Sequence, residues 1–235
     1  MKRFYKAAGV GKVGGETEGG FRVELDGRPV RSPAKAPLVF PSLPLAQGVA
    51  DEWAAQGDQI DAHSMPLMQL SSTAVDLIPV KRPEIVPAIS AYAETDLLCY
   101  RAEHPQPLVE RQARLWQPLL DWAALTYDAP LHVCAGLMPK PQPDEALAAL
   151  RRVVEQTDDW YLSALQTATG VCGSIIVALA LLEGRLSAEE AFDVSQLDET
   201  YQIEQWGEDA EATKRRTNVR AEIVACRRFV DLLRG

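Results

Sequence analysis

Residues 170–182 read GVCGSIIVALALL and form the longest apolar stretch of the chain. The stretch is shorter than the roughly 20 residues that a membrane span needs. Gly173 and Ser174 are small side chains that let neighbouring helices approach closely. We therefore predict that this segment is the buried central helix of a soluble bundle, with no membrane insertion.

Helical periodicity dominates the sequence on both sides of this stretch, from about residue 64 onward. Prolines stand at or near many of the predicted helix starts, where a missing N–H costs nothing. The predicted helices cover residues 68–78, 83–93, 107–127, 143–166, 170–183, 187–206 and 209–233, with short extended pieces at 97–100 and 131–134.

The first sixty residues have a strand pattern instead. Residues 3–8 are a predicted strand, followed by a glycine-rich loop. In FRVELDGRPVR (residues 21–31) apolar and charged residues alternate at the strand period up to Asp26-Gly27. Asp-Gly is a strong signal for a type I′ hairpin turn, and Pro29 in the returning strand indicates a sheet edge because proline donates no ladder hydrogen bond. A helix over residues 44–56 follows.

These patterns predict an α+β fold with two lobes. A small β-rich N-terminal lobe, residues 1–62, packs on a larger and mainly α-helical C-terminal lobe, residues 63–235. A chain of 235 residues is long enough for one large domain or two small ones.

Charge and cysteine usage narrow the class of protein. The net charge is −9, which is the wrong sign for neutralising nucleic-acid phosphates or anionic lipid, so we expect a basic partner and no nucleic acid. The four cysteines have no spacing typical of a disulfide framework or a zinc site, and we expect reduced thiols. The start, MKRFYK, has no apolar signal region and no presequence pattern, which favours a cytoplasmic protein.

Two motifs resemble catalytic or cofactor-binding signatures, but the sequence elements that must accompany each of them are absent. Gly9-x-Gly11-x-x-Gly14 matches the dinucleotide fingerprint, but the sequence after it is a loop with two acidic residues and no helix; we interpret it as part of a flexible hairpin. Ser32-Pro-Ala-Lys35 matches S-x-x-K without the accompanying S-D-N and K-T-G elements. The histidines His63, His104 and His132 are isolated, without the spacing of metal ligands, so we predict no metal site. No G-x-S-x-G, Walker A, H-E-x-x-H or EF-hand pattern occurs, so we predict no catalytic residue and no cofactor.

The strongest anomaly in composition is the segment 187–211, which contains nine acidic residues and no Lys or Arg, whereas residues 214–234 contain seven basic and two acidic residues. One interpretation is that two solvated helices pair their charges, each exposed pair contributing about 0–1 kcal/mol. The other is a partner-binding face. On a helix Glu199, Ile203 and Trp206 share one side, and a carboxylate beside apolar groups favours an Arg- or Lys-bearing partner. For Trp206 alone, packing in the core is the competing interpretation.

Five segments, in order along the chain, resemble one family: the assembly chaperones that bind the α subunit of the catalytic head of the F-type ATP synthase. They are LDGRPVRSPAK (25–35), EWAAQG (52–57), TDLLCYRA (95–102), RQARLWQPLLDW (111–122) and LDETYQIEQWG (197–207).

The resemblance implies a β-rich N-terminal part, a helical C-terminal part and no nucleotide hydrolysis. It implies a chaperone that holds a new α subunit, and shields its nucleotide-site interface, until the β subunit replaces it. It links an acidic residue before Trp206-Gly207 to function; we assign that role to Glu199, with Glu204 as the alternative. The expected partner-binding residues are Glu199, Glu204, Trp206, Asp209 and Glu211, in a bacterial cytoplasmic protein that is monomeric when free.

Two other classes of function remain open at this stage. One is a small-molecule enzyme that uses Glu199, Glu204 or Asp96 as an acid or base in a cleft between the lobes, which requires a perturbed carboxylate pKa in a closed apolar pocket. The other is a helical scaffold unrelated to ATP synthase.

Overall fold

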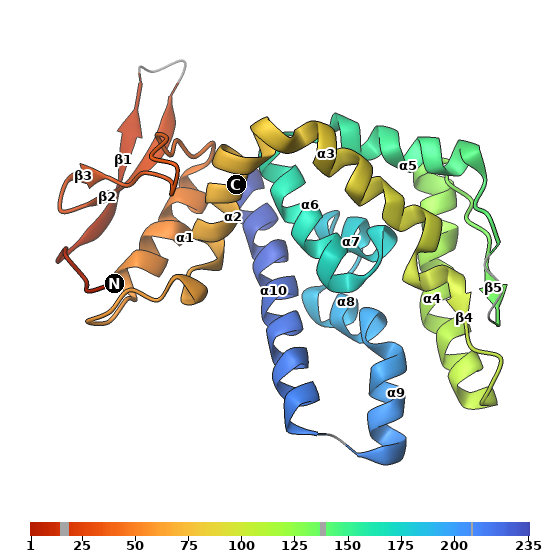
Figure 1. The fold of residues 1–235 in the computed structure, drawn as a ribbon. Helices are drawn as coiled ribbons and strands as arrows, with labels where there is room; N and C mark the ends of the chain where they lie inside the picture. Colours follow the sequence, from red (N-terminus) through yellow and green to blue (C-terminus); the bar gives the residue numbers. More distant parts are fainter. Residues whose placement is uncertain (15–18, 137–139, 208) are drawn as a thin grey trace. The chain divides into compact units, whose positions relative to one another are not determined.

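The computed structural model describes residues 1–14, 19–136, 140–207 and 209–235, which form a small sheet near the N-terminus followed by a mostly helical chain (Figure 1). The strands are β1 Ala8–Val13, β2 Gly20–Leu25, β3 Arg28–Pro29, β4 Tyr100–Arg101 and β5 Cys134–Ala135. The α-helices are α1 Leu43–Ala54, α2 Pro66–Ser72, α3 Ile78–Ala91, α4 Gln106–Tyr127, α5 Asp144–Gln156, α6 Asp159–Cys172, α7 Ile175–Leu182, α8 Ala188–Ser195, α9 Leu197–Trp206 and α10 Ala210–Arg234. Short 3-10 turns cover Ala62–Ser64, Tyr92–Thr95 and Leu97–Cys99, and a π-turn covers Thr73–Leu77. The α+β class is confirmed.

The chain divides into two compact units. The first comprises residues 1–82, 158–164 and 228–235, and the second comprises residues 83–157 and 165–227. Helices α3, α6 and α10 therefore contribute residues to both. The lobe boundary near residue 62 stays a prediction.

In the first unit the sheet has the order β1-β2-β3 and both pairs are antiparallel. Asp26 and Gly27 have φ angles of 49° and 78°, as a type I′ turn requires, so the predicted hairpin is confirmed. Pro29 lies in the edge strand β3, also as predicted. Helix α1 packs against β1 and β2, and Gly48 lets it come close to neighbours, since a Cβ there would lie 2.8 Å from Leu232 Cδ1.

The prediction of the first strand, over residues 3–8, was wrong. Strand β1 covers Ala8–Val13, and Gly9 and Gly11 pair with Glu24 and Arg22 of β2. The glycines predicted to form a loop therefore form a ladder, because β2 supplies the pairing that their low strand propensity does not. The next described element after the glycine motif is strand β2, not a helix. The last glycine of the motif, Gly14, precedes residues 15–18, which lie outside the described part of the chain, as does most of the predicted loop.

The second unit is built around α7. All eight residues Ile175–Leu182 are buried, which confirms the predicted central helix. Ser174 caps it by accepting the N–H of Val177 at 3.0 Å. Taken over the described residues, no helix is both long and apolar enough to cross a membrane.

Three predicted helices are interrupted. The helix predicted over 143–166 is α5 and α6, separated at Thr157, whose ψ of 146° is extended. Gly173, at φ 65°, divides the helix predicted over 170–183, and Gln196 separates α8 from α9.

Candidate functional surface

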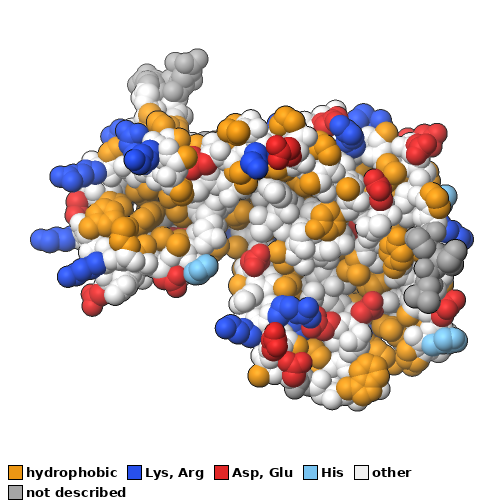
Figure 2. Space-filling view, viewed as in Figure 1, with side chains coloured by type: hydrophobic (Ala, Val, Ile, Leu, Met, Phe, Trp, Pro, Cys, Tyr) orange, Lys and Arg blue, Asp and Glu red, His pale blue; other side chains and the backbone are white. Residues whose placement is uncertain are grey.

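Helix α9 ends in an exposed tryptophan. Trp206 is its last residue and is 80% exposed. Gly207, at φ 88°, ends the helix, and its N–H donates to the Ile203 carbonyl at 2.8 Å. Hydrophobic side chains lie beside acidic and basic ones at this end of the unit (Figure 2). The core interpretation of Trp206 is therefore wrong: the indole is presented to solvent at a sharp corner of the backbone.

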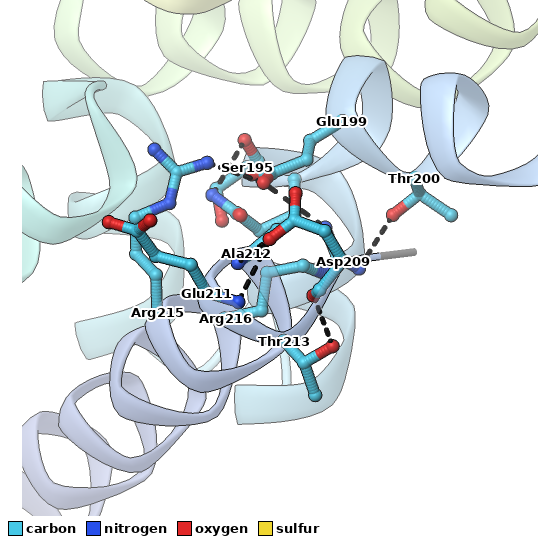
Figure 3. Close-up of polar contacts among 10 residues, drawn as sticks. Ser195, Glu199, Thr200, Asp209, Glu211, Ala212, Thr213, Arg215 and Arg216 are labelled. Atoms are coloured by element: carbon cyan, nitrogen blue, oxygen red, sulfur yellow. Dashed lines mark hydrogen bonds and ion pairs between the residues drawn. The ribbon is translucent and has the colours of Figure 1, made fainter. Parts of the chain in front are cut away.

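Glu199 lies on the same helix but is already paired within the chain. Its carboxylate forms an ion pair with Arg215 of α10 and lies 3.9 Å from Nη1 of Arg216 (Figure 3). Arg216 donates from Nη2 to Thr200 Oγ1 at 2.9 Å, and its guanidinium carbon lies 5.1 Å from the centre of the Phe192 ring. The charge-pairing interpretation thus holds for α9 and α10 at this residue.

The same interpretation holds one helix earlier. Glu189 of α8 forms an ion pair with Arg220 of α10, and both side chains are 54% exposed. The Arg220 guanidinium beside Glu189 lowers the pKa of that carboxyl below its usual range. Acidic residues of the segment 187–211 therefore pair with basic residues of the segment 214–234 and hold α8 and α9 against α10.

Glu204 has a different partner, which sequence reasoning missed. Both of its carboxylate oxygens accept hydrogen bonds from Arg111 of α4, each at 2.9 Å. The hydrogen bond from Arg111 lowers the pKa of Glu204. Arg111 also lies over the Tyr201 ring, 5.5 Å from its centre. Bidentate Arg–carboxylate pairs fix geometry well, so α9 is held to α4 as well as to α10.

Asp209 and Glu211 lie at the start of α10. One oxygen of Asp209 accepts the N–H groups of Glu211 and Ala212, both at 2.8 Å, so its carboxylate caps the helix. Glu211 is exposed, and no ion pair of its carboxylate is found within the described residues. Both residues line a shallow open depression of about 500 Å³, together with Ala212, Lys214, Arg215 and Asn218.

The five predicted residues thus lie on α9 and at the start of α10 as one corner of the second unit. Arginines of α10 and α4 engage Glu199 and Glu204, and Asp209 caps α10. The exposed Trp206 indole and Glu211 carboxylate have no such partner within the described residues. The order of charges along residues 187–234 was the sequence signal for the pairing, but nothing in the sequence identified Arg111 as the partner of Glu204.

The arrangement is suited to binding rather than to acid–base chemistry. Glu204 is ion-paired with a lowered pKa, whereas a general acid needs a raised one. Burial raises the pKa of Asp96 to about 6, but its side chain is fully enclosed and its oxygens accept several hydrogen bonds, so it is not placed to exchange a proton with a substrate. Within the described residues no group of three His, Cys, Asp or Glu side chains could hold a metal ion, and all four cysteines are free and buried.

Comparisons with known proteins identify the class. The family model of the ATP12 chaperone protein matches residues 2–124. The crystal structure of Atp12 from Paracoccus denitrificans is similar with a TM-score of 0.92 and 38% identity, covering 99% of this chain and 98% of that one. The crystal structure of the Atu1473 protein from Agrobacterium tumefaciens matches with a TM-score of 0.91 and 43% identity, covering 99% of this chain and 86% of that one. The mitochondrial atp12 protein of Schizosaccharomyces pombe is 28% identical over an alignment of 228 residues that covers 89% of this chain and 76% of that protein.

These similarities define a chaperone that acts in ATP synthase assembly, which implies a partner among the subunits of that enzyme. The chain belongs to the ATP12 chaperone family.

Proposed function

We propose that this chaperone binds the unassembled α subunit of the F-type ATP synthase catalytic head and shields its nucleotide-site interface until the β subunit replaces it. The binding residues would be Glu199, Glu204, Trp206, Asp209 and Glu211. We place the protein in the bacterial cytoplasm, as a monomer when free, without a cofactor or catalytic activity of its own.

The observation that carries this proposal is the 80% exposure of Trp206 at the end of a helix that is otherwise anchored. Glu199 and Glu204 hold α9 to α10 and α4 through arginines, so the indole is presented on a rigid support. Tryptophan is enriched among the residues that dominate binding energy at interfaces. The exposed Glu211 carboxylate, which has no ion pair within the described residues, favours a client face that contains arginines and lysines.

The test is co-expression of the chain with the α subunit alone, followed by size-exclusion chromatography. We expect α to remain soluble and to co-elute with the chaperone. The proposal fails if α aggregates to the same extent with and without the chaperone and no complex elutes. Capture of a different dominant partner from a lysate would favour the scaffold alternative.

A further inference from the structure

The first unit contains a hydrophobic pocket that includes none of the residues assigned above. A pocket of about 500 Å³ is lined by residues that include Met1, Phe4, Tyr5, Arg28, Arg31 and Trp53. Figure 2 shows hydrophobic side chains around a hollow on this unit, with Lys and Arg side chains projecting beside it. All of the lining residues belong to the first unit.

The pocket has a buried aromatic wall and an exposed hydrophobic rim. Tyr5 and Trp53 are 6% and 8% exposed and meet edge to face, with ring centroids 5.6 Å apart. Phe4 stacks edge-on against Tyr5 at 5.4 Å, yet it is 66% exposed. Met1 is 72% exposed. The Trp53 indole N–H has no acceptor among the described residues, so the wall also contains an unpaired donor.

The backbone that carries Phe4 is fixed on both sides. The N–H of Arg3 donates to the Asp58 carbonyl at 2.9 Å. The N–H groups of Lys6 and Ala7 donate to the Asp26 carboxylate at 2.9–3.1 Å. Phe4 therefore does not project from a loose terminus; ordered hydrogen bonds hold it toward solvent.

The charges at the rim favour an acidic occupant. Arg28 and Arg31 are exposed, and the one lining carboxylate, Asp26, is engaged by the N–H groups of Lys6 and Ala7, which lower its pKa. The basic character extends beyond the rim: residues 1–36 contain eight Lys and Arg but four Asp and Glu, in a chain whose net charge is −9. A second copy of this acidic chain is a weaker candidate for the occupant. The acidic side chains of its helices α8 and α9 are largely paired with its own arginines.

We propose that this pocket, the Phe4 pocket, binds an acidic segment of the client polypeptide in which an aromatic or aliphatic side chain enters between Phe4 and Trp53 while flanking carboxylates meet Arg28 and Arg31. The edge strand β3 beside it is two residues long and pairs on one side with β2, so an extended segment has room along it. The inference rests on the proposed function only in requiring that the client is a polypeptide.

The first experiment uses a fluorescein-labelled synthetic peptide, GDELFEDG, and fluorescence anisotropy. We expect binding to the wild-type chain that weakens at least tenfold in Phe4→Ser and at least threefold in Arg28→Gln and in Arg31→Gln. A peptide with Asn and Gln in place of its acids should bind weakly, and salt should weaken the acidic peptide. The matched controls are Leu125→Ser, which removes an 89% exposed leucine of the second unit, and Arg152→Gln, an exposed arginine of α5.

No binding of the acidic peptide to the wild-type chain, or equal loss in the control variants, overturns the proposal. So does a dimer of the chaperone that dissociates in Phe4→Ser, because the occupant would then be a second copy.

A second experiment separates this inference from the proposed function. A photo-crosslinking benzoylphenylalanine is placed at position 4, or at position 125 as the control, and the chain is co-expressed with the α subunit. We expect α to crosslink at position 4 and not at position 125. If α co-purifies with the chaperone but does not crosslink at position 4, the Phe4 pocket proposal fails while the proposed function stands. If α never co-purifies but the acidic peptide binds as expected, the proposed function fails instead.

Discussion

Asp96 connects two elements of the second unit from a fully buried position. Its carboxylate accepts hydrogen bonds from Ser174 Oγ at 2.8 and 2.9 Å, from the Leu98 N–H at 3.1 Å and from the Ile176 N–H at 3.3 Å. Burial raises the pKa of Asp96 to about 6, against the opposing effect of these hydrogen bonds. The side chain therefore joins the turn after α3 to the start of α7.

This residue makes stability depend on pH. The folded protein binds the Asp96 proton more tightly than the unfolded chain, whose aspartate pKa is about 3.9. The stabilising contribution is thus fully present below about pH 4 and is lost as the pH rises through about 6. We expect the free energy of unfolding of the wild type, relative to that of Asp96→Asn, to fall by about 2 kcal/mol between pH 4 and pH 7.

Urea unfolding of both proteins at several pH values measures this difference. Asp128→Asn is the matched control, because Asp128 is exposed and asparagine tolerates its left-handed φ of 56°; its pH profile should parallel the wild type. A wild-type curve parallel to that of Asp96→Asn would show that Asp96 does not titrate between pH 4 and pH 7.

Glu52 stabilises the start of α2 in the first unit. Its two oxygens accept the N–H groups of Leu67 and Met68, at 2.8 and 2.9 Å, and burial raises its pKa. Glu52→Ala leaves both buried N–H groups without an acceptor, so we expect a loss of about 3 kcal/mol in the free energy of unfolding. Urea titration checks this, with the exposed neighbour Asp51→Ala as the control, which should change stability by less than about 0.5 kcal/mol. Equal effects in the two variants would contradict the capping role.

At the scale of elements, patterns with strong local signals were predicted well. Asp26-Gly27 determines the hairpin through its own turn chemistry, and the apolar run 170–182 allowed no other place for α7 than the core. The breaks at Thr157 and Gln196 were not predictable, because the amphipathic period continues through them and tertiary packing decides where the helix turns. The corner at Gly207 was predicted, but the exposure of Trp206 depends on which elements fill the space beside it.

Helix α9 should bind through its exposed end. Trp206→Ala removes an indole that makes little core contact, so we expect a melting temperature within about 2 °C of the wild type. If the indole is a dominant contact, its loss costs about 2 kcal/mol or more of binding, which is about 30-fold in the dissociation constant for the α subunit. Titration calorimetry with α measures this, and Leu125→Ala, another highly exposed side chain, serves as the control. Unchanged affinity in Trp206→Ala would remove the central residue of the proposed surface.

Glu199 acts at the junction of α9 and α10. The Arg215 side chain that pairs with it is 66% exposed, so we expect Glu199→Gln to change the free energy of unfolding by less than about 1 kcal/mol. We expect binding of the α subunit to weaken, because the substitution releases Arg215 and loosens the support of Trp206. Calorimetry with the α subunit and thermal unfolding together distinguish a binding role of Glu199 from a structural one. A large drop in melting temperature would mean that Glu199 is structural and contributes to binding only through the fold.

Across the whole chain, charge is distributed unevenly. Residues 37–235 contain 16 basic and 29 acidic residues, whereas residues 1–36 have an excess of basic ones. The two proposed surfaces therefore differ in the client chemistry that they favour: the α9–α10 corner favours basic segments, and the Phe4 pocket favours acidic ones. Under the two proposals, a client polypeptide that contains both kinds of segment would contact the chaperone through charged surfaces on different parts of the chain rather than through one large apolar interface. Such contacts are easier to exchange, as an assembly intermediate requires.

Release by the β subunit is the prediction that follows for the intact protein. A chaperone interface that must be given up should be of moderate size, since large apolar interfaces are characteristic of permanent complexes. We expect that adding excess β to the purified chaperone–α complex yields free chaperone and an α–β complex in size-exclusion chromatography. Most differences in affinity between related complexes arise in the dissociation rate, so Trp206→Ala should speed this exchange. A stable ternary complex after addition of β would show that α presents separate surfaces to the two proteins, and that the chaperone does not cover the interface that β uses.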